Sequence, residues 1–182
     1  MVFADRELKE KEMLRAVIDM CHVCSIGFHD EPYPYVVPVN FGYVWESEPL
    51  MLYIHGARAD GHMRKLMAQD NRVCAQMNKF IDRNLDASYR GENHDYRSVT
   101  VFGRMEEVEE EAEYVAALNA IRVHNDRSPI FCKAPKALRD QLCIWRITAE
   151  EITGKAQYPV SSVAEIEMPP HPSPLETVKE KK

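Results

Sequence analysis

The feature that most constrains this chain is the stretch of residues 33–64, which has the pattern of a β-hairpin followed by the start of a helix. Two runs rich in Val, Tyr, Ile and Phe, YPYVVPVNFGY and LMLYIHGA, flank a short, acidic, turn-prone insert. Gly61 follows the second run and precedes the predicted helix. Because a helix start presents free backbone N–H groups and the positive end of its dipole, this stretch predicts a site for a phosphate-bearing cofactor.

The first run of the hairpin predicts a strand that is not paired along its whole length. Its residues alternate between two faces, with Tyr33 and Phe41 at the ends of one face and Pro34 and Pro38 on the other. Proline cannot donate a ladder hydrogen bond, so part of this strand must lie at a sheet edge or an interruption. A backbone with unpaired groups is available to hydrogen-bond a flat polar ligand.

The remaining pattern favours a β-barrel with appended helices. Strands are expected over residues 20–28, 33–43, 50–55, 72–80, 96–107 and 142–147, and helices over residues 5–19, 60–69, 136–141 and from the acidic run 106–113 to residue 125. Gly103 predicts a bend or a bulge, and the polar segment 82–95 predicts a binding loop or a dimer arm. Because strands and helices do not alternate regularly, the chain is expected to be mainly β rather than a doubly wound sheet.

Composition supports one domain and argues against several classes of protein. At 182 residues the chain is long enough for a single core, which we expect over residues 1–157, followed by a Pro-rich, flexible tail over residues 158–182. The net charge of −6 predicts no nucleic-acid partner, and the absence of a long apolar run predicts no membrane insertion. The charged amino terminus is unlike a secretory signal, which predicts a cytoplasmic protein.

The motif Cys21-His22-Val23-Cys24 has the spacing of half a zinc site. A complete zinc site needs four ligands, and the sequence offers no second pair at suitable spacing. The five cysteines also form no tight framework of the kind that disulfides need. We therefore predict no metal, five reduced thiols, and buried, structural roles for Cys21 and Cys24.

Several segments, taken together and in their order along the chain, resemble a known family. They are PYVVPVNFGY, LYIHGA, NRVCAQM, YRSVTVFGRMEEVEE and ITAEEITGK. They are similar to the flavin-binding split-barrel superfamily of pyridoxamine 5'-phosphate oxidase, and within it to the nitroimidazole-resistance (Nim-type) branch. The resemblance covers residues 21–155 and leaves out the amino-terminal helix and the tail.

The resemblance implies a six-stranded split β-barrel of the FMN-binding type, and a homodimer with FMN at the subunit interface. It implies that the end of the first run lies against the flavin ring and that the end of the second run leads to the phosphate. The residues concerned are Val37, Pro38, Val39, Asn40, Ile54, His55, Gly56 and Ala57. The second subunit is expected to contribute residues near Ser98.

One departure from the family pattern concerns the phosphate. Members of the family usually read Gly-Arg-Lys where this chain has Gly61-His62-Met63, and the lysine contacts the phosphate. His62 and Arg64 are nearby and are predicted to bind the cofactor, and Arg58 offers a further charge. Three outcomes stay open: FMN binds through a rearranged phosphate site, FMN binds weakly, or another ligand uses the cleft.

His55 and Asn40 each have two interpretations. In the Nim-type branch the matching histidine lies beside the flavin and is linked to catalysis, which makes His55 the predicted catalytic residue. The alternative is a strand-end histidine that hydrogen-bonds the barrel. Asn40 either donates to a flavin carbonyl, which we favour, or caps a strand end. A proton donor beside the flavin would help to reduce a nitro group, because electron delivery leaves negative charge to be neutralised.

Two functions from different classes follow from these residues. The first is an FMN-dependent oxidoreductase that carries out the two-electron reduction of a small, nitroaromatic-type substrate with NAD(P)H or another donor. The second is a non-catalytic flavin- or haem-binding protein of the same fold, in which His55 and His62 would be haem ligands. Pyridoxamine phosphate oxidase activity is a weaker third option, because the substrate-binding carboxy-terminal segment of that enzyme has no evident match here.

Overall fold

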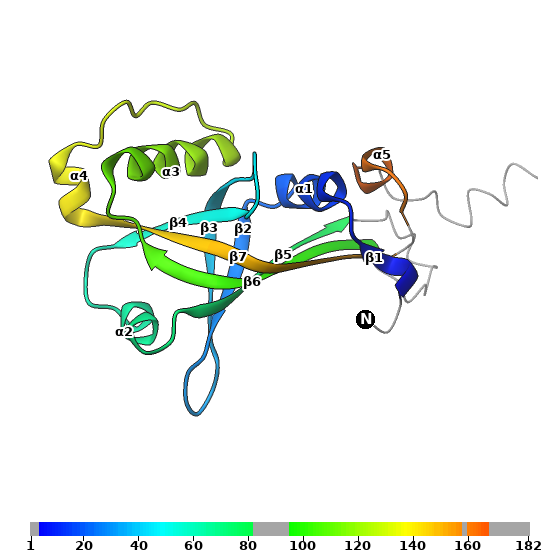
Figure 1. Cartoon of the computed structure of the whole chain (residues 1–182), viewed down its shortest axis with the longest axis horizontal. Coiled ribbons are helices and arrows are strands. Elements are labelled where there is room, and N and C mark those ends of the chain that lie inside the picture. Colours follow the sequence, from blue (N-terminus) through cyan, green and yellow to red (C-terminus); the bar gives the residue numbers. More distant parts are fainter. Residues whose placement is uncertain (1–3, 82–94, 158–159, 168–182) are drawn as a thin grey trace, which may run out of the picture. The chain divides into compact units, whose positions relative to one another are not determined.

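The computed structural model describes residues 4–81, 95–157 and 160–167 (Figure 1). The strands are β1 Glu7–Leu8, β2 Val23–Phe28, β3 Tyr35–Val44, β4 Met51–Ala57, β5 Arg72–Ile81, β6 Asp95–Glu107 and β7 Leu142–Ala156. The helices are the 3-10 helix η1 Ala4–Arg6 and the α-helices α1 Lys11–Asp19, α2 His62–Gln69, α3 Glu111–His124, α4 Lys136–Gln141 and α5 Val163–Glu167.

The chain groups into two compact units. The smaller unit consists of Met1–Cys21, Met77–Val99 and Thr153–Lys182. The larger unit consists of His22–Gln76 and Thr100–Ile152, and every residue of it is described. The candidate site lies within this larger unit.

The architecture is mainly β, as predicted. Hydrogen bonds join the strands in the order β1-β7-β4-β3-β2-β5-β6, and a further pairing of β7 with β6 closes six of them into an antiparallel barrel. β1 is the extra strand and pairs with the end of β7. At Gly103 in β6 an added Cβ would collide with the backbone carbonyl of Thr148 in β7. This glycine therefore allows the close approach of the two strands that complete the barrel.

The amino-terminal end folds differently from the sequence prediction. A helix is expected over residues 5–19, but α1 begins only at Lys11. Leu8 instead pairs with Gly154, and its side chain is buried. The pairing with β7 holds residues 7–8 in an extended conformation and buries the Leu8 side chain, so the helix begins after them. β7 is correspondingly longer than the predicted strand 142–147, because its last residues pair with β1.

The segment predicted as a long loop, residues 82–95, lies outside the described residues except for Asp95, which begins β6. Most of the predicted tail over residues 158–182 lies outside them too, although α5 falls within it and buries Ile166. The single domain over residues 1–157 and the flexible tail therefore stay predictions. Among the described helices, none is long and apolar enough to cross a membrane.

β3 is the incompletely paired strand that its prolines predict. Residues 35–40 pair with β2 along one edge, whereas β4 pairs only with residues 41–44 along the other. Pro38 lies in the singly paired half, where a residue without a backbone N–H is tolerated. The predicted alternation is also confirmed, because the even-numbered side chains in residues 35–40 are exposed and the odd-numbered ones are half-buried.

Helix α3 packs against β3 and β4 in the larger unit (Figure 1). Gly42 permits this contact, because a Cβ at that position would collide with the backbone of Ile121. Tyr114, Leu118 and Ile121 recur at helical spacing and bury one face of α3 in a cluster that includes Tyr53 of β4. This packing places the C-terminal end of α3 beside the strands that carry the predicted site.

The burial predicted for the two clustered cysteines is confirmed. Cys21 and Cys24 are both buried, and burial raises the pKa of the Cys21 thiol to about 11. The described residues include all five cysteines and contain no disulfide. They also contain no group of three or more His, Cys, Asp or Glu side chains that could hold a metal ion.

Candidate functional site

A groove of about 360 Å³ lies where β3 and β4 meet the C-terminal end of α3 and the loop that follows it. Its polar and aromatic lining residues are Asn40, His55, Arg122, Asn125, Arg127 and Phe131, and leucine and isoleucine side chains complete the wall. Ligand pockets usually measure about 300–1,000 Å³, so this groove suits a small molecule. The groove brings together two of the predicted site residues, Asn40 and His55.

An amide network holds β3 against the end of α3. Asn40 donates from Nδ2 to the carbonyl oxygen of His22 at 3.0 Å and to Oδ1 of Asn125 at 3.1 Å. Asn125, the C-cap residue of α3, donates from Nδ2 to the carbonyl oxygens of Phe41 and Ile121, both at 2.8 Å. Both N–H groups of the Asn40 amide are therefore engaged within the protein. This geometry favours the interpretation of Asn40 as a structural residue over its interpretation as a donor to a flavin carbonyl.

The loop after α3 is held by the helix itself. Asn119 donates to the carbonyl oxygen of Phe131 at 2.7 Å, and its Oδ1 accepts from the backbone N–H groups of Ile130 and Phe131, both at 3.1 Å. Arg122 donates from Nε to the carbonyl oxygen of Ser128 at 2.9 Å. Its guanidinium carbon lies 5.9 Å from the centroid of the Phe131 ring. One wall of the groove is thus ordered by hydrogen bonds that need no ligand.

His55 lies near the end of β4 with an exposed side chain that lines the groove. No hydrogen bond joins its ring to any residue of the described chain. The interpretation of His55 as a histidine that hydrogen-bonds the barrel therefore finds no support in the described residues. Its catalytic role stays a prediction.

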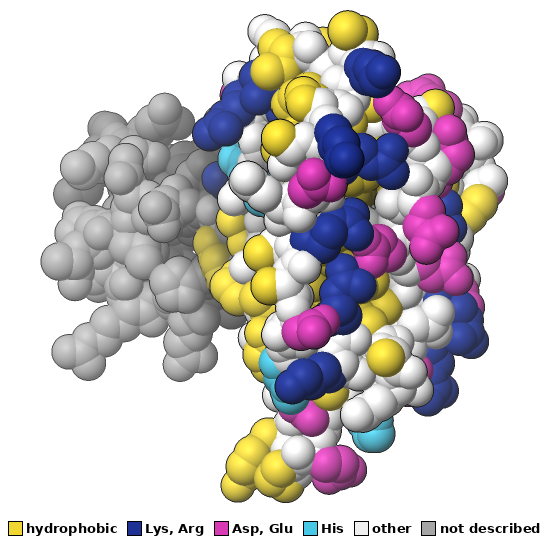
Figure 2. Space-filling model, turned by 90° about the vertical axis from the view of Figure 1, so that its left-hand side faces the viewer, with side chains coloured by type: hydrophobic (Ala, Val, Ile, Leu, Met, Phe, Trp, Pro, Cys, Tyr) yellow, Lys and Arg dark blue, Asp and Glu magenta, His cyan; other side chains and the backbone are white. Residues whose placement is uncertain are grey.

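The groove lining contains no carboxylate, although the chain as a whole carries a net charge of −6. Arg122 and Arg127 add two positive charges, and no carboxylate of a described residue lies within 4.0 Å of either side chain. Figure 2 shows that, on the face carrying α2 and α4, Lys and Arg side chains form a band down the middle, with most Asp and Glu side chains to one side. The groove lining therefore carries positive charge without carboxylates, and a site with such a charge distribution attracts anions.

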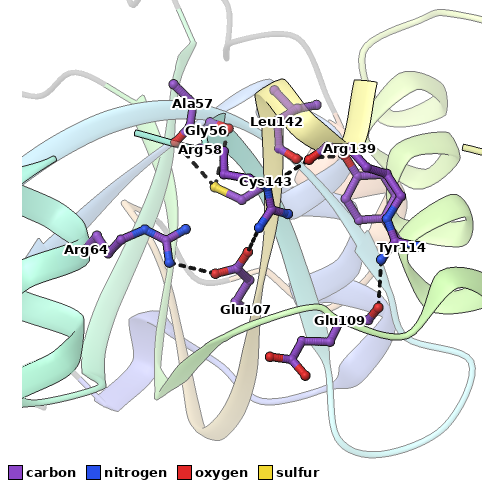
Figure 3. Close-up of polar contacts among 10 residues, drawn as sticks. All are labelled: Gly56, Ala57, Arg58, Arg64, Glu107, Glu109, Tyr114, Arg139, Leu142 and Cys143. Carbon is purple, nitrogen blue, oxygen red and sulfur yellow. Dashed lines mark hydrogen bonds and ion pairs between the residues drawn. The ribbon is translucent and has the colours of Figure 1, made fainter. Parts of the chain in front are cut away.

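A second basic region lies where β4 ends and α2 begins, and here a carboxylate is present. Glu107 of β6 forms an ion pair with Nη1 of Arg58 and accepts a hydrogen bond from Nη1 of Arg64, both at 2.8 Å (Figure 3). The Glu107 side chain is only 19% exposed, so both guanidinium groups meet it largely away from water. The hydrogen bond with Glu107 is the main cause of the raised pKa of Arg64. We call Arg58, Glu107 and Arg64 the arginine clamp.

Apolar and sulfur-containing side chains fill the space beside the arginine clamp. Cys143 Sγ lies 3.4 Å from the carbonyl oxygen of Gly56 (Figure 3). The Met63 methyl group, where the resemblance leads one to expect a lysine, lies 3.8 Å from the position of a Cβ on Gly56. Arg64 lies over the ring of Trp145 at 4.9 Å, and two buried donors, Arg64 Nη2 and Trp145 Nε1, have no hydrogen-bond partner among the described residues.

His62 at the start of α2 is already engaged. Its Nε2 lies 2.6 Å from Oδ2 of Asp30, and its ring meets the Tyr35 ring edge-on at a centroid distance of 5.0 Å. The hydrogen bond with His62 is the main cause that lowers the pKa of Asp30 below its usual value of 3.8. A phosphate at the start of α2 would compete with Asp30 for this histidine.

The other predicted cofactor residues do not line the groove. On β3 and β4 they are Val37, Pro38, Val39, Ile54, Gly56 and Ala57. Ile54 is fully buried, so its side chain supports the strand and is closed to a ligand. Ser98 is half-buried and belongs to the smaller unit. Cofactor binding by these residues stays a prediction.

The sequence prediction missed the helix and loop side of the groove. Asn125 stands at the expected helix end, and Arg122 and Arg127 flank it, but nothing local connects them to Asn40, which is 85 positions away from Asn125. Glu107 was similarly hidden, because it belongs to an acidic run that is typical of a solvated helix start. The one sequence signal that could have pointed to this side of the groove is the pair of arginines that flank Asn125 at the predicted helix end.

A closed, antiparallel, six-stranded barrel with a ligand-sized groove between β3, β4 and the end of α3 defines a protein of the split-barrel class. The chain belongs to the pyridoxamine 5'-phosphate oxidase family, because the model of that family matches residues 10–156. The family resemblance expected from the sequence is confirmed. No curated protein matches the chain.

Solved structures share this fold. A candidate 5-nitroimidazole antibiotic resistance protein from Bacteroides thetaiotaomicron VPI-5482 is 26% identical, with a TM-score of 0.68 over 82% of this chain and 86% of that chain. An FAD-binding protein from Mesorhizobium loti is 23% identical, with a TM-score of 0.56 over 83% and 96%. The FAD and haem binding protein from Mycobacterium smegmatis is 15% identical, with a TM-score of 0.63 over 88% and 78%. The last two likenesses concern the fold alone.

Proposed function

We propose that this protein binds FMN and acts as an oxidoreductase that reduces a small, flat substrate, such as a nitroaromatic, by two electrons. The observation that carries the proposal is the open His55 ring beside a strand that is paired on one edge only, in a barrel of this family. The likeness to a candidate 5-nitroimidazole resistance protein supports the choice of substrate class.

The ring side of the proposed flavin site is residues 37–40 of β3. β4 pairs only with residues 41–44 of β3. On the edge of β3 that faces β4, the backbone groups of residues 37–40 therefore pair with no described strand. These groups are available to hydrogen-bond the polar edge of a flat ring. Pro38 is exposed in this segment and can contribute an apolar surface.

The residues on the phosphate side of the proposed site are chemically suited to FMN, because guanidinium groups bind phosphates in bidentate fashion. Arg58 directly follows β4 and Arg64 lies in the first turn of α2, and Arg64 Nη2 is a buried donor without a partner among the described residues. Glu107 already binds both arginines, so a phosphate would have to share them. Of the three outcomes left open by Met63, we propose the rearranged phosphate site built on the arginine clamp.

A bound flavin would supply the two-electron transfer. The groove residues would position the substrate and hold a proton near it. His55 has an exposed ring on the strand wall and would donate this proton to the substrate atom that gains negative charge. Leu118 and Leu142 line the groove and would exclude water from the substrate.

We extend the proposal to a homodimer with FMN at the subunit interface, residues near Ser98 from the second subunit, NAD(P)H as the electron donor, and a cytoplasmic location. Exposed apolar side chains support the dimer: Val23 of β2 is 48% exposed and Val36 of β3 is 57% exposed. A haem ligated by His55 and His62 receives less support, because His62 is hydrogen-bonded to Asp30.

The test is the absorption spectrum of the purified protein, with mass analysis of the released ligand. We expect a flavin spectrum, FMN on denaturation, and flavin that is reduced by NAD(P)H and reoxidised by a nitroaromatic. The H55Q variant should keep the flavin and lose most of the reoxidation by the nitroaromatic, and E109Q, which changes an exposed carboxylate, serves as the control. A protein that takes up no FMN, or that carries haem alone, would contradict the proposal.

A further inference from the structure

We infer that the groove between β3, β4 and the end of α3 is a binding site for a small organic carboxylate with an aromatic body. This inference rests on the proposed function only in taking that carboxylate to be the substrate. The binding itself is argued from the groove and can be measured without an electron donor.

The first step is the pairing of arginines across the larger unit. Six of its arginines have a carboxylate within 4.0 Å, and they are Arg58, Arg64, Arg72, Arg104, Arg139 and Arg146. The two others, Arg122 and Arg127, have none among the described residues, and both line the groove. The arginines of the larger unit that have no carboxylate partner among the described residues therefore both lie at this groove.

The second step is that the helix and loop wall of the groove, which carries both arginines, is held in place by hydrogen bonds within the protein. Arg122 is fixed by its Nε hydrogen bond to the carbonyl oxygen of Ser128, which leaves its terminal nitrogens for a ligand. Arg127 follows in the same turn, and its backbone N–H donates to the carbonyl oxygen of Arg122 at 2.9 Å. Asn119 holds the rest of the loop. A pre-ordered cation loses less entropy when it binds, so a carboxylate suits this wall well.

The third step is the apolar part of the lining. Phe131 offers an aromatic surface, and Leu118 and Ile121 offer aliphatic ones. An inorganic anion such as free phosphate would leave these surfaces without contacts, whereas an aromatic carboxylate covers them. His55 and the arginines lie on different walls, strand and helix, so a carboxylate held by the arginines would direct the rest of the molecule toward His55.

The experiment compares 4-nitrobenzoate with 4-nitrobenzamide, which has nearly the same shape and no charge, by titration calorimetry without an electron donor. We expect 4-nitrobenzoate to bind about tenfold more tightly, the usual size of a charge-assisted hydrogen bond. The double variant R122Q/R127Q should reduce this preference to less than about twofold. The double variant R104Q/K136Q removes the same amount of charge outside the groove lining and should keep the preference.

Circular dichroism of each variant would confirm that it folds. Equal affinity for the two compounds, no binding of either, or a preference that persists in R122Q/R127Q would overturn the inference. Preferential binding of 4-nitrobenzoate without reduction of its nitro group, in protein supplied with FMN and NAD(P)H, would support the inference and count against the proposed function alone.

Discussion

The larger unit contains two pairs of arginines in opposite surroundings. Arg58 and Arg64 share the carboxylate of Glu107 at 2.8 Å, whereas Arg122 and Arg127 have no carboxylate within 4.0 Å among the described residues. The first pair shares one carboxylate largely away from water, so its charge is partly compensated inside the protein and its removal should affect stability. The second pair keeps its charge at the edge of a groove, so its main effect is on what can bind there. The first pair is thus already engaged within the fold, and a phosphate would have to share it with Glu107, whereas the second pair has no such competitor among the described residues.

The groove depends on the contact of α3 with β3, and breaking that contact should have the largest effect. In Gly42→Ala the new methyl group would collide with the backbone of Ile121. We expect the free energy of unfolding to fall by about 3 kcal/mol, the upper range for overpacking, and the affinity for 4-nitrobenzoate to fall as the groove deforms. Urea denaturation measures the first quantity. Gly27→Ala is the control, since the nearest atom to its Cβ is the Cys74 carbonyl oxygen at an ordinary 3.7 Å.

Breaking the arginine clamp should have the second largest effect on stability. Glu107→Gln removes the charge that two guanidinium groups share at a position only 19% exposed. We expect a loss of about 2 kcal/mol in the free energy of unfolding, since charge-assisted hydrogen bonds are weakened and two cations are left close together. Glu109→Gln, at an exposed position two residues away, should change it by less than about 0.5 kcal/mol. Equal stability of the two variants would show that the clamp is not a stabilising feature.

A matched pair of arginine variants compares the two regions directly. Arg64→Gln removes a hydrogen bond to Glu107 and the contact with the Trp145 ring, and we expect it to cost about 1–2 kcal/mol of stability. Arg127→Gln, in contrast, removes an exposed side chain without a carboxylate partner, and it should change stability by less than about 0.5 kcal/mol. Thermal and urea unfolding of both variants would measure the difference. A larger loss of stability in Arg127→Gln than in Arg64→Gln would contradict the assignment of the more stabilising contacts to Arg64.

The ion pair of Asp30 with His62 provides the smallest expected effect, because exposed ion pairs contribute little. The folded-state pKa of Asp30 lies below its usual value of 3.8, so the pair stabilises the fold at pH values above 3.8. This contribution is lost as the pH falls through the lowered pKa. The stability difference between the wild type and Asp30→Asn should therefore shrink as the pH falls below 3.8. A difference that grew as the pH fell would contradict this assignment.

Much of the barrel could be predicted from the sequence, because its signals are local. Alternation and two prolines over residues 33–43 predicted a strand with one unpaired stretch, and the structure pairs residues 35–40 of β3 along one edge only. The early part of the chain was predicted less well. Leu8 joins β7 through a partner, Gly154, that lies almost at the other end of the described chain, and no local pattern contains that information.

The sequence by itself determined the family, the six strands of the barrel and the place of His55 near the end of β4. Only the tertiary structure decided which charges are neutralised and which are left for a ligand. Glu107 reaches Arg64 across 43 positions, and Asn125 reaches Asn40 across 85. The physical reason is that electrostatic energy depends on distance and burial, and both of these are set by how the strands and α3 pack.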